Sequence, residues 1–279
     1  MFFNKKSMKL THSLITVLLL TLTATLHAAD PTGESKPAAA AQPESKTEAA
    51  VPRGLTPFTP AADLKGAWSF TADPKLPNVL LIGDSISIGY TRSVREKLTG
   101  KVNVYRPMNG TGPDNCGDTT IGLKKIDGWL GKQKWDVIHF NWGLWDLCYR
   151  NPASKEQGGR DKVGGKILST PADYEKNLEQ LVTRLEATGA KLIWANTTVV
   201  PEGEAGRFVG DDEKYNAIAG RVMQKHGIAT DDLFTLTKGF AGKYSTKAGD
   251  VHYTAAGYEK LAVQVAATIE SSLTKKTEP

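Results

Sequence analysis

Ser85 and His252 are the two side chains of this sequence best suited to act together as a nucleophile and its base. Ser85 follows the apolar run 79–82 and precedes an amphipathic stretch at 90–98, so the local order is strand, tight turn, helix. A side chain at the carboxyl end of a strand lies where α/β sheets place their reactive groups. The alternative interpretation is a plain helix start, capped by Asp84 or Ser85.

A serine hydroxyl needs a neighbouring base, and three histidines remain outside the N-terminal segment. His139 falls within an apolar run. His226 precedes Gly227 at a helix end, where a cation interacts favourably with the helix dipole. His252 instead lies in a loop just before a helix capped by Thr254, and is therefore the candidate base.

Apolar runs of strand length alternate with helical patterns along most of the chain. This alternation predicts an α/β fold with a parallel five-stranded sheet and helices on both faces. The expected strands are 78–82, 102–105, 135–140, 191–195 and 228–233, and the expected helices include 120–130, 171–188, 211–226 and 254–273.

Four segments resemble the conserved blocks of the GDSL/SGNH hydrolases, and the similarity extends over about 78–267. They are Ile82-Gly-Asp-Ser-Ile86 (block I), Asn115-Cys-Gly-Asp-Thr119 (block II), Trp135–Asp146 (block III) and Asp250–Tyr258 (block V). The resemblance implies a flavodoxin-like three-layer α/β/α sandwich in which Ser85 is the nucleophile and His252 the base. It also implies that the N–H groups of Gly117 and Ser85 bind the oxyanion.

The first departure from the family pattern is in block III, which usually reads Gly-x-Asn-Asp and uses its Asn as a further oxyanion donor. Trp145 occupies that Asn position here. If the strand continues, Asn141, Gly143 and Trp145 share a face, and we expect Asn141 to take the donor role. The alternative is that Asn141 caps the strand end and that no third donor exists.

The second departure concerns the acid that orients the histidine. The family spacing Asp-x-x-His puts Gly249 at the Asp position, so Asp250 stands one residue too close to His252. We expect Asp250 to orient His252 nevertheless. The alternatives are a backbone carbonyl or a distant acid, Asp231 or Asp232. An acid in this role fixes the tautomer and stabilises the imidazolium.

The N-terminus predicts export to the periplasm or the medium. Residues 1–28 carry Lys5, Lys6 and Lys9, the apolar run 14–22 and small residues, a pattern typical of a signal peptide. Its removal lowers the formal net charge from +5 to +2, because it holds three lysines and no acid. Residues 29–63, rich in Ala, Pro, Glu and Lys, predict a disordered linker, and 64–275 the folded domain. An uncleaved anchor is the alternative for the first segment.

These features favour an exported serine esterase acting on O-acyl groups, most simply O-acetyl groups of a carbohydrate. The alternatives are an SGNH-fold binding module with degraded catalytic residues, an O-acetyltransferase, and, outside the family, a flavodoxin-like cofactor binder. We expect a small-molecule or polysaccharide ester as the partner, without nucleic acid or stable membrane insertion. No cofactor or metal is expected, because the chain has no C-x-x-C and no clustered His/Cys spacing.

Three further features bear on the pocket. Tyr90, Trp142, Trp145 and Tyr149 are expected either around its mouth or in the core. The glycine-rich loop 151–168 is long enough to close over a substrate. Cys116 and Cys148 follow different strands, and either form a disulfide beside Ser85 or remain two separate buried thiols.

Overall fold

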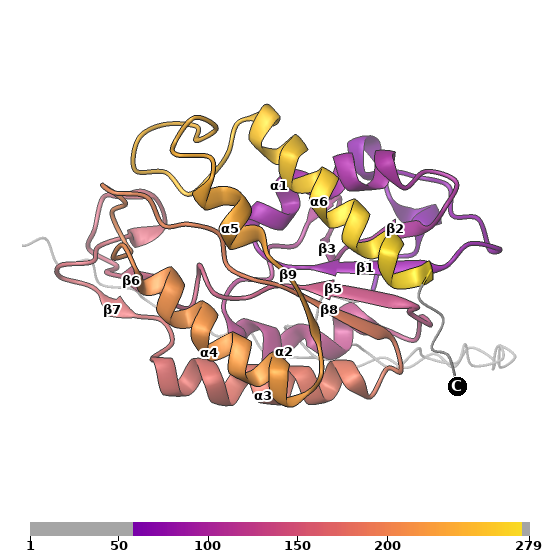
Figure 1. Ribbon diagram of the computed structural model, residues 1–279, viewed down its shortest axis with the longest axis horizontal. Helices are drawn as coiled ribbons and strands as arrows, with labels where there is room; N and C mark the ends of the chain where they lie inside the picture. Colours follow the sequence, from indigo (N-terminus) through magenta and orange to yellow (C-terminus); the bar gives the residue numbers. More distant parts are fainter. Residues whose placement is uncertain (1–57, 275–279) are drawn as a thin grey trace, which may run out of the picture. The chain divides into compact units, whose positions relative to one another are not determined.

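Five parallel strands form the central sheet of the computed structural model, which describes residues 58–274 (Figure 1). Their order across the sheet is β2-β1-β5-β8-β9. The bounds are β1 (Asn78–Ile82), β2 (Asn103–Tyr105), β5 (Val137–Phe140), β8 (Lys191–Ala195) and β9 (Ala229–Asp231). The predicted parallel five-stranded sheet is confirmed, and the ends of β1 and β8 agree with the sequence pattern.

Helices cover both faces of the sheet (Figure 1). On one face α1 (Ser85–Lys97) packs against α6 (Ala255–Thr274), and the short α5 (Leu233–Lys238) adjoins α6. On the other face α3 (Pro171–Glu186) lies between α2 (Thr119–Leu130) and α4 (Asp211–Lys225). The result is the three-layer sandwich that the alternating sequence pattern predicts.

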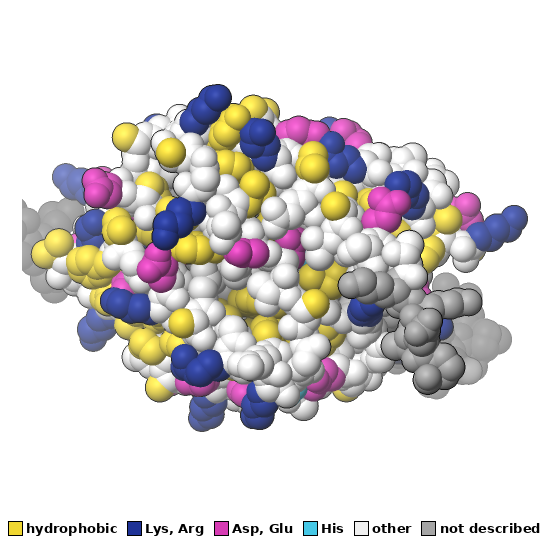
Figure 2. Space-filling view, viewed as in Figure 1, with side chains coloured by type: hydrophobic (Ala, Val, Ile, Leu, Met, Phe, Trp, Pro, Cys, Tyr) yellow, Lys and Arg dark blue, Asp and Glu magenta, His cyan; other side chains and the backbone are white. Residues whose placement is uncertain are grey.

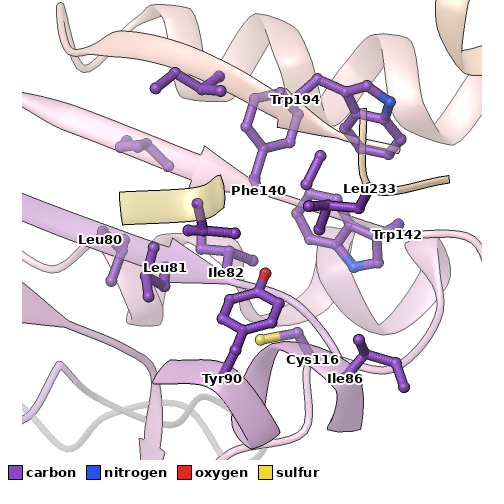
Figure 3. Close-up of a cluster of buried hydrophobic side chains, with 14 of the residues drawn as sticks. Leu80, Leu81, Ile82, Ile86, Tyr90, Cys116, Phe140, Trp142, Trp194 and Leu233 are labelled. Carbon is purple, nitrogen blue, oxygen red and sulfur yellow. The ribbon is translucent and has the colours of Figure 1, made fainter. Parts of the chain in front are cut away.

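Strand β1 is the centre of the core. Its four apolar residues, 79–82, have at most 1% of their surface exposed, as expected for a parallel strand covered on both faces. Figure 3 shows Leu80, Leu81 and Ile82 in the same buried cluster as the aromatic rings of Phe140 and Trp194. Ile82 pairs in register with Phe140 of β5, so the two parallel strands end at the same level of the sheet. Ser85 lies at this carboxyl end of β1.

Short elements that the sequence pattern did not reveal complete the fold. Two small hairpins join β3 (Met108–Asn109) to β4 (Gly112–Pro113), and β6 (Tyr149–Arg150) to β7 (Lys166–Ile167). The run 228–233, expected to be one strand, divides into β9 and the start of α5. The division comes at Asp232, whose side chain accepts a hydrogen bond from Thr235 N–H and so caps α5.

The folded domain begins before Leu64, the boundary that the composition suggested. Phe58 packs against Tyr105 and Trp135, with ring-centroid distances of 5.6 and 5.3 Å, and Ala61 is buried. These apolar residues attach the end of the predicted linker to the domain. The predicted signal peptide and the linker up to residue 57 lie outside the described residues. Within 58–274, no helix is long and apolar enough to cross a bilayer.

The two cysteines are free buried thiols, so the disulfide prediction is wrong and its alternative holds. Figure 3 shows the sulfur of Cys116 beside the ring of Tyr90. The Cys148 thiol instead faces Gly206, and its nearest hydrogen-bond acceptor is the carbonyl of Tyr149 at 3.6 Å. Burial raises the pKa of Cys116 to about 12 and also raises that of Cys148, so neither thiol is a ready nucleophile.

Candidate active site

Ser85 is the first residue of α1, held there by a tight turn. Asp84 caps the helix by accepting a hydrogen bond from Ile86 N–H at 2.9 Å. Beneath the turn, the buried Arg106 donates to the carbonyl oxygens of Gly83 and Asp114, at 3.4 and 3.0 Å. The guanidinium group therefore ties the turn after β1 to the loop that carries the block II residues.

The structure brings Ser85 and His252 together although 167 residues separate them. Ser85 Oγ lies 2.9 Å from His252 Nε2, and His252 Nδ1 lies 2.7 Å from Asp250 Oδ1. The predicted proximity of the serine and the histidine is confirmed. Asp250 is also the acid next to the imidazole, as expected in spite of its unusual spacing.

Hydrogen bonds keep Asp250 ionised. Burial by itself would raise its pKa, but the Thr246 hydroxyl and the side chain and backbone N–H of His252 lower the pKa of this carboxyl to about 2. An ionised carboxylate can only accept hydrogen bonds, so Nδ1 of His252 carries the proton. Nε2 is then free to accept the proton of Ser85 Oγ.

Gly249 shows why the acid is displaced by one residue. Its φ of +69° is in the left-handed region, and a Cβ at this position would lie 2.7 Å from the carbonyl oxygen of Gly203. An aspartate at position 249 would therefore be strained and would collide with backbone. The distant alternatives are engaged elsewhere: Asp231 bonds His139 at 3.0 Å, and Asp232 caps α5.

Of the two backbone N–H groups predicted to bind the oxyanion, one is free within the described part of the chain and the other is already hydrogen-bonded. Ser85 N–H has no acceptor among residues 58–274 and lies at the N-terminus of α1, which favours a negative charge. Gly117 N–H, however, donates to the side-chain oxygen of Asn115 at 3.1 Å. Asn115 itself lines the pocket beside Ser85. Asn115 begins the block II segment, but only the folded structure shows that it lines the pocket.

Asn141 is not brought into this pocket. The chain leaves the strand after Phe140, and its path turns at Gly143, so residues 141–145 do not continue as one extended face. The Asn141 amide donates to the carbonyl oxygen of Ala195 at 2.8 Å, and the residue borders a separate small cavity. The assumption of a continuing strand is wrong, and the structure gives the predicted donor role of Asn141 no support.

A pocket of about 250 Å³ opens in front of Ser85 and His252. Trp145 lines it, whereas Tyr90 and Trp142 are core residues and Tyr149 packs against Phe208. The loop 151–168 contributes Gln157, Gly158 and Arg160 to the wall. The remaining lining residues are Asp84, Asn115, Leu144, Arg150, Arg207, Asp250 and Val251.

Residues 58–274 contain no evident metal centre, and the face seen in Figure 2 carries no basic stripe. No group of three or more His, Cys, Asp or Glu side chains within 58–274 could hold a metal ion. On the face seen in Figure 2, Lys and Arg side chains are dispersed, with acidic and uncharged side chains between them. Nucleic-acid binding would need a clustered basic face.

A family model and several solved structures resemble this chain. The model of the GDSL-like lipase/acylhydrolase family matches residues 81–260. A lipase/acylhydrolase from Enterococcus faecalis shares the fold with a TM-score of 0.57 and 20% identity, over 72% of this chain and all of that one. An acetylxylan esterase from Geobacillus stearothermophilus has a TM-score of 0.54 and 15% identity, over 69% of this chain and 94% of that one.

A second acetyl xylan esterase, AlAXEase, has a TM-score of 0.52 and 16% identity, over 69% of this chain and 99% of that one. No curated protein sequence matches the chain. The family model covers well over half of the sequence and includes Ser85, Gly117, Asp250 and His252. The chain therefore belongs to the GDSL-like lipase/acylhydrolase family and is an ester-bond hydrolase.

Proposed function

We propose that this protein is an exported serine esterase that removes O-acetyl groups from a carbohydrate, with Ser85, His252 and Asp250 as its catalytic residues. The observation that carries the proposal is the chain of two hydrogen bonds, 2.9 and 2.7 Å, that joins the three side chains in one pocket. Degraded machinery, as in the binding-module alternative, would not need this alignment.

The geometry supports a two-step reaction. His252 Nε2 takes the proton from Ser85 Oγ, which attacks the acetyl carbonyl carbon. The oxyanion of the tetrahedral intermediate is stabilised by Ser85 N–H and the positive end of α1. His252 then protonates the leaving sugar hydroxyl. Water, activated by the same imidazole, releases acetate and restores Ser85.

The substrate class is supported by similarity and by the shape of the pocket. Two of the solved structures that share this fold are acetylxylan esterases. The pocket is small, which suits a short acyl group, and the half-buried Trp145 forms part of its wall. An acyltransferase would use the same residues, so adding a free sugar acceptor and looking for acetylated product distinguishes transfer from hydrolysis.

We also propose export, on the basis of the predicted signal peptide at 1–28. Cell fractionation and N-terminal sequencing of the mature protein test it. A mature chain that starts close to Ala29 in the periplasm or the medium supports export. An intact N-terminus on a cytoplasmic protein contradicts it.

The test of the activity uses p-nitrophenyl acetate with and without a serine-directed phosphonate. We expect turnover that the phosphonate abolishes, with a covalent adduct mapped to Ser85. Ser85→Ala should lose turnover and labelling while it keeps the melting temperature of the parent protein. Absence of both turnover and labelling in the folded parent protein would reject the esterase and favour the binding module.

A further inference from the structure

We propose that three arginines of the pocket, Arg150, Arg160 and Arg207, form an anion subsite, so that the natural substrate is an acidic O-acetylated saccharide. The subsite would bind a carboxylate or sulfate group of the sugar next to the acetylated position. This inference rests on the proposed esterase function and names the substrate class of the same pocket. All three side chains line the cavity that contains Ser85 and His252.

Arg207 and Arg160 are fixed by one buried carboxylate. Glu204 Oε1 accepts from Nη1 of both arginines at 2.9 Å, and the Glu204 side chain is 0% exposed. Arg207 Nε also donates to the carbonyl oxygen of Leu144 at 2.6 Å. These bonds use Nε and Nη1 of Arg207, and its Nη2 has no acceptor among residues 58–274. Arg207 is 4% exposed and lines the pocket, and Nη2 is the donor that its internal bonds leave for a ligand.

Arg160, like Arg207, is fixed by hydrogen bonds from its Nε and Nη1 atoms. Its Nε donates to the carbonyl oxygen of Gln157 at 3.1 Å, and its Nη1 donates to Glu204. Within the described chain Nη2 has no acceptor. The two guanidinium groups thus share one carboxylate, and each keeps a donor that a ligand could use.

Arg150 has no carboxylate partner in the described part of the chain. Its guanidinium carbon lies 4.8 Å from the centroid of the Trp145 ring, and Nη1 donates to the carbonyl oxygen of Gly158. The stacking on Trp145 fixes the plane of the guanidinium at the pocket wall. The two carboxyl groups of the lining make hydrogen bonds away from the arginines, since Asp84 caps α1 and Asp250 bonds His252.

The arrangement suits an anion better than a neutral sugar. Guanidinium groups present paired donors that match the oxygens of a carboxylate or a sulfate. A neutral xylose ring has only hydroxyl groups, which neutralise none of this charge. Preformed, partly desolvated arginines therefore favour an acidic saccharide over a neutral one of the same size.

Binding to the full-length Ser85→Ala variant tests the inference independently of turnover. Calorimetry would compare three probes of equal length: xylotriose, trigalacturonic acid and a sulfated galactotriose. We expect at least one acidic probe to bind about tenfold or more tightly than xylotriose. The tighter of the two acidic probes identifies carboxylate or sulfate as the anion.

Variants in the same background assign the preference to the arginines. Arg150→Gln should reduce the preference for the acidic probe, and Arg150→Lys, which keeps the charge but not the planar fork, should give an intermediate value. Arg221→Gln is the matched control, because this exposed arginine on α4 pairs with Glu175 outside the pocket. It should leave the preference unchanged.

The inference is overturned if xylotriose binds as tightly as both acidic probes, if none of the three binds, or if Arg150→Gln and Arg221→Gln have the same effect. Failure of the esterase itself would show differently, as lack of p-nitrophenyl acetate turnover by the parent protein. An acidic preference in Ser85→Ala together with an inactive parent would keep the ligand class and reject the reaction.

Discussion

At the scale of single residues, the orientation of the imidazole depends on the hydrogen bonds that Asp250 makes. This carboxylate accepts from His252 Nδ1, His252 N and Thr246 Oγ1, and its pKa of about 2 keeps it ionised across the neutral range. Because its folded pKa is lowered, its contribution to stability is present above the ordinary value and is lost as the pH falls towards 2. The Asp250 side chain therefore keeps its negative charge throughout the neutral pH range.

Asp250→Asn should lower kcat by about 10³- to 10⁴-fold, because the amide can donate to Nδ1 and so favour the wrong tautomer. The melting temperature at neutral pH should change far less. Steady-state kinetics with p-nitrophenyl acetate and thermal denaturation measure the two effects. Thr246→Val, which removes only one bond to Asp250, is the control and should cost less activity. Wild-type kcat in Asp250→Asn would mean that another group orients His252.

Asn115 is the residue of the pocket whose role the sequence did not reveal. Its side-chain oxygen accepts from Gly117 N–H, the residue lines the pocket, and we expect its NH₂ group to serve as an oxyanion donor. Asn115→Ala should therefore lower kcat by about a hundredfold, the effect of losing one oxyanion donor. Asn141→Ala is the comparison, since its amide is bonded to Ala195, and it should affect stability more than kcat. The reverse pattern would restore the donor role to Asn141.

At the scale of elements, Asp146 connects two helices beneath the pocket. Its Oδ1 accepts from the backbone N–H and hydroxyl of Thr119 at the start of α2, and from the hydroxyl of Ser169 just before α3. Burial raises its pKa to about 7, although the bonds from Thr119 and Ser169 oppose that rise. The folded protein thus binds a proton here that the unfolded chain releases at lower pH.

The stability contribution of Asp146 should consequently fall as the pH rises from about 4 to about 7, because the folded state loses its extra proton over that range. Asp146→Asn cannot ionise and should lack this part of the pH dependence. Denaturant unfolding of both proteins at a series of pH values measures it. Parallel stability curves for the two proteins would show that Asp146 is ionised when folded. Asp173→Asn is the control, because it removes one negative charge at an exposed position on α3 without changing a buried carboxyl group.

The elements differ in how far the sequence determines them. The runs 78–82 and 191–195 are mostly buried apolar strands, so their apolar character is sufficient to predict them from the sequence. The path after β5 could not be predicted in the same way. It depends on Gly143, where a Cβ would lie 1.9 Å from Thr197 Oγ1, a contact between distant parts of the chain. The ion pair between Arg207 and Glu204 could not be predicted either, because nothing in the sequence shows that Glu204 is buried.

At the scale of the whole molecule, the motifs predicted the position of the site, whereas composition misplaced the start of the domain. Ser85 and His252 come together because Ser85 follows β1 at the start of α1, and His252 lies just before α6, which packs against α1. The composition of 58–63 resembles that of the preceding residues and therefore predicts linker. Its two apolar contacts with the domain could only be seen in the folded structure.

Phe58 should therefore contribute to the stability of the domain although it lies ahead of every predicted element. Its ring is partly buried against Tyr105 and Trp135, so Phe58→Ala should cost about 1–3 kcal/mol in the free energy of unfolding, somewhat less than a fully buried ring. Phe208→Ala is the control, because that ring is 42% exposed and should cost less. A chain that starts at Leu64 should be destabilised like Phe58→Ala, relative to one that starts at Arg53. If the two chains melt at the same temperature, the contacts of Phe58 add nothing to stability and the domain begins where the composition placed it.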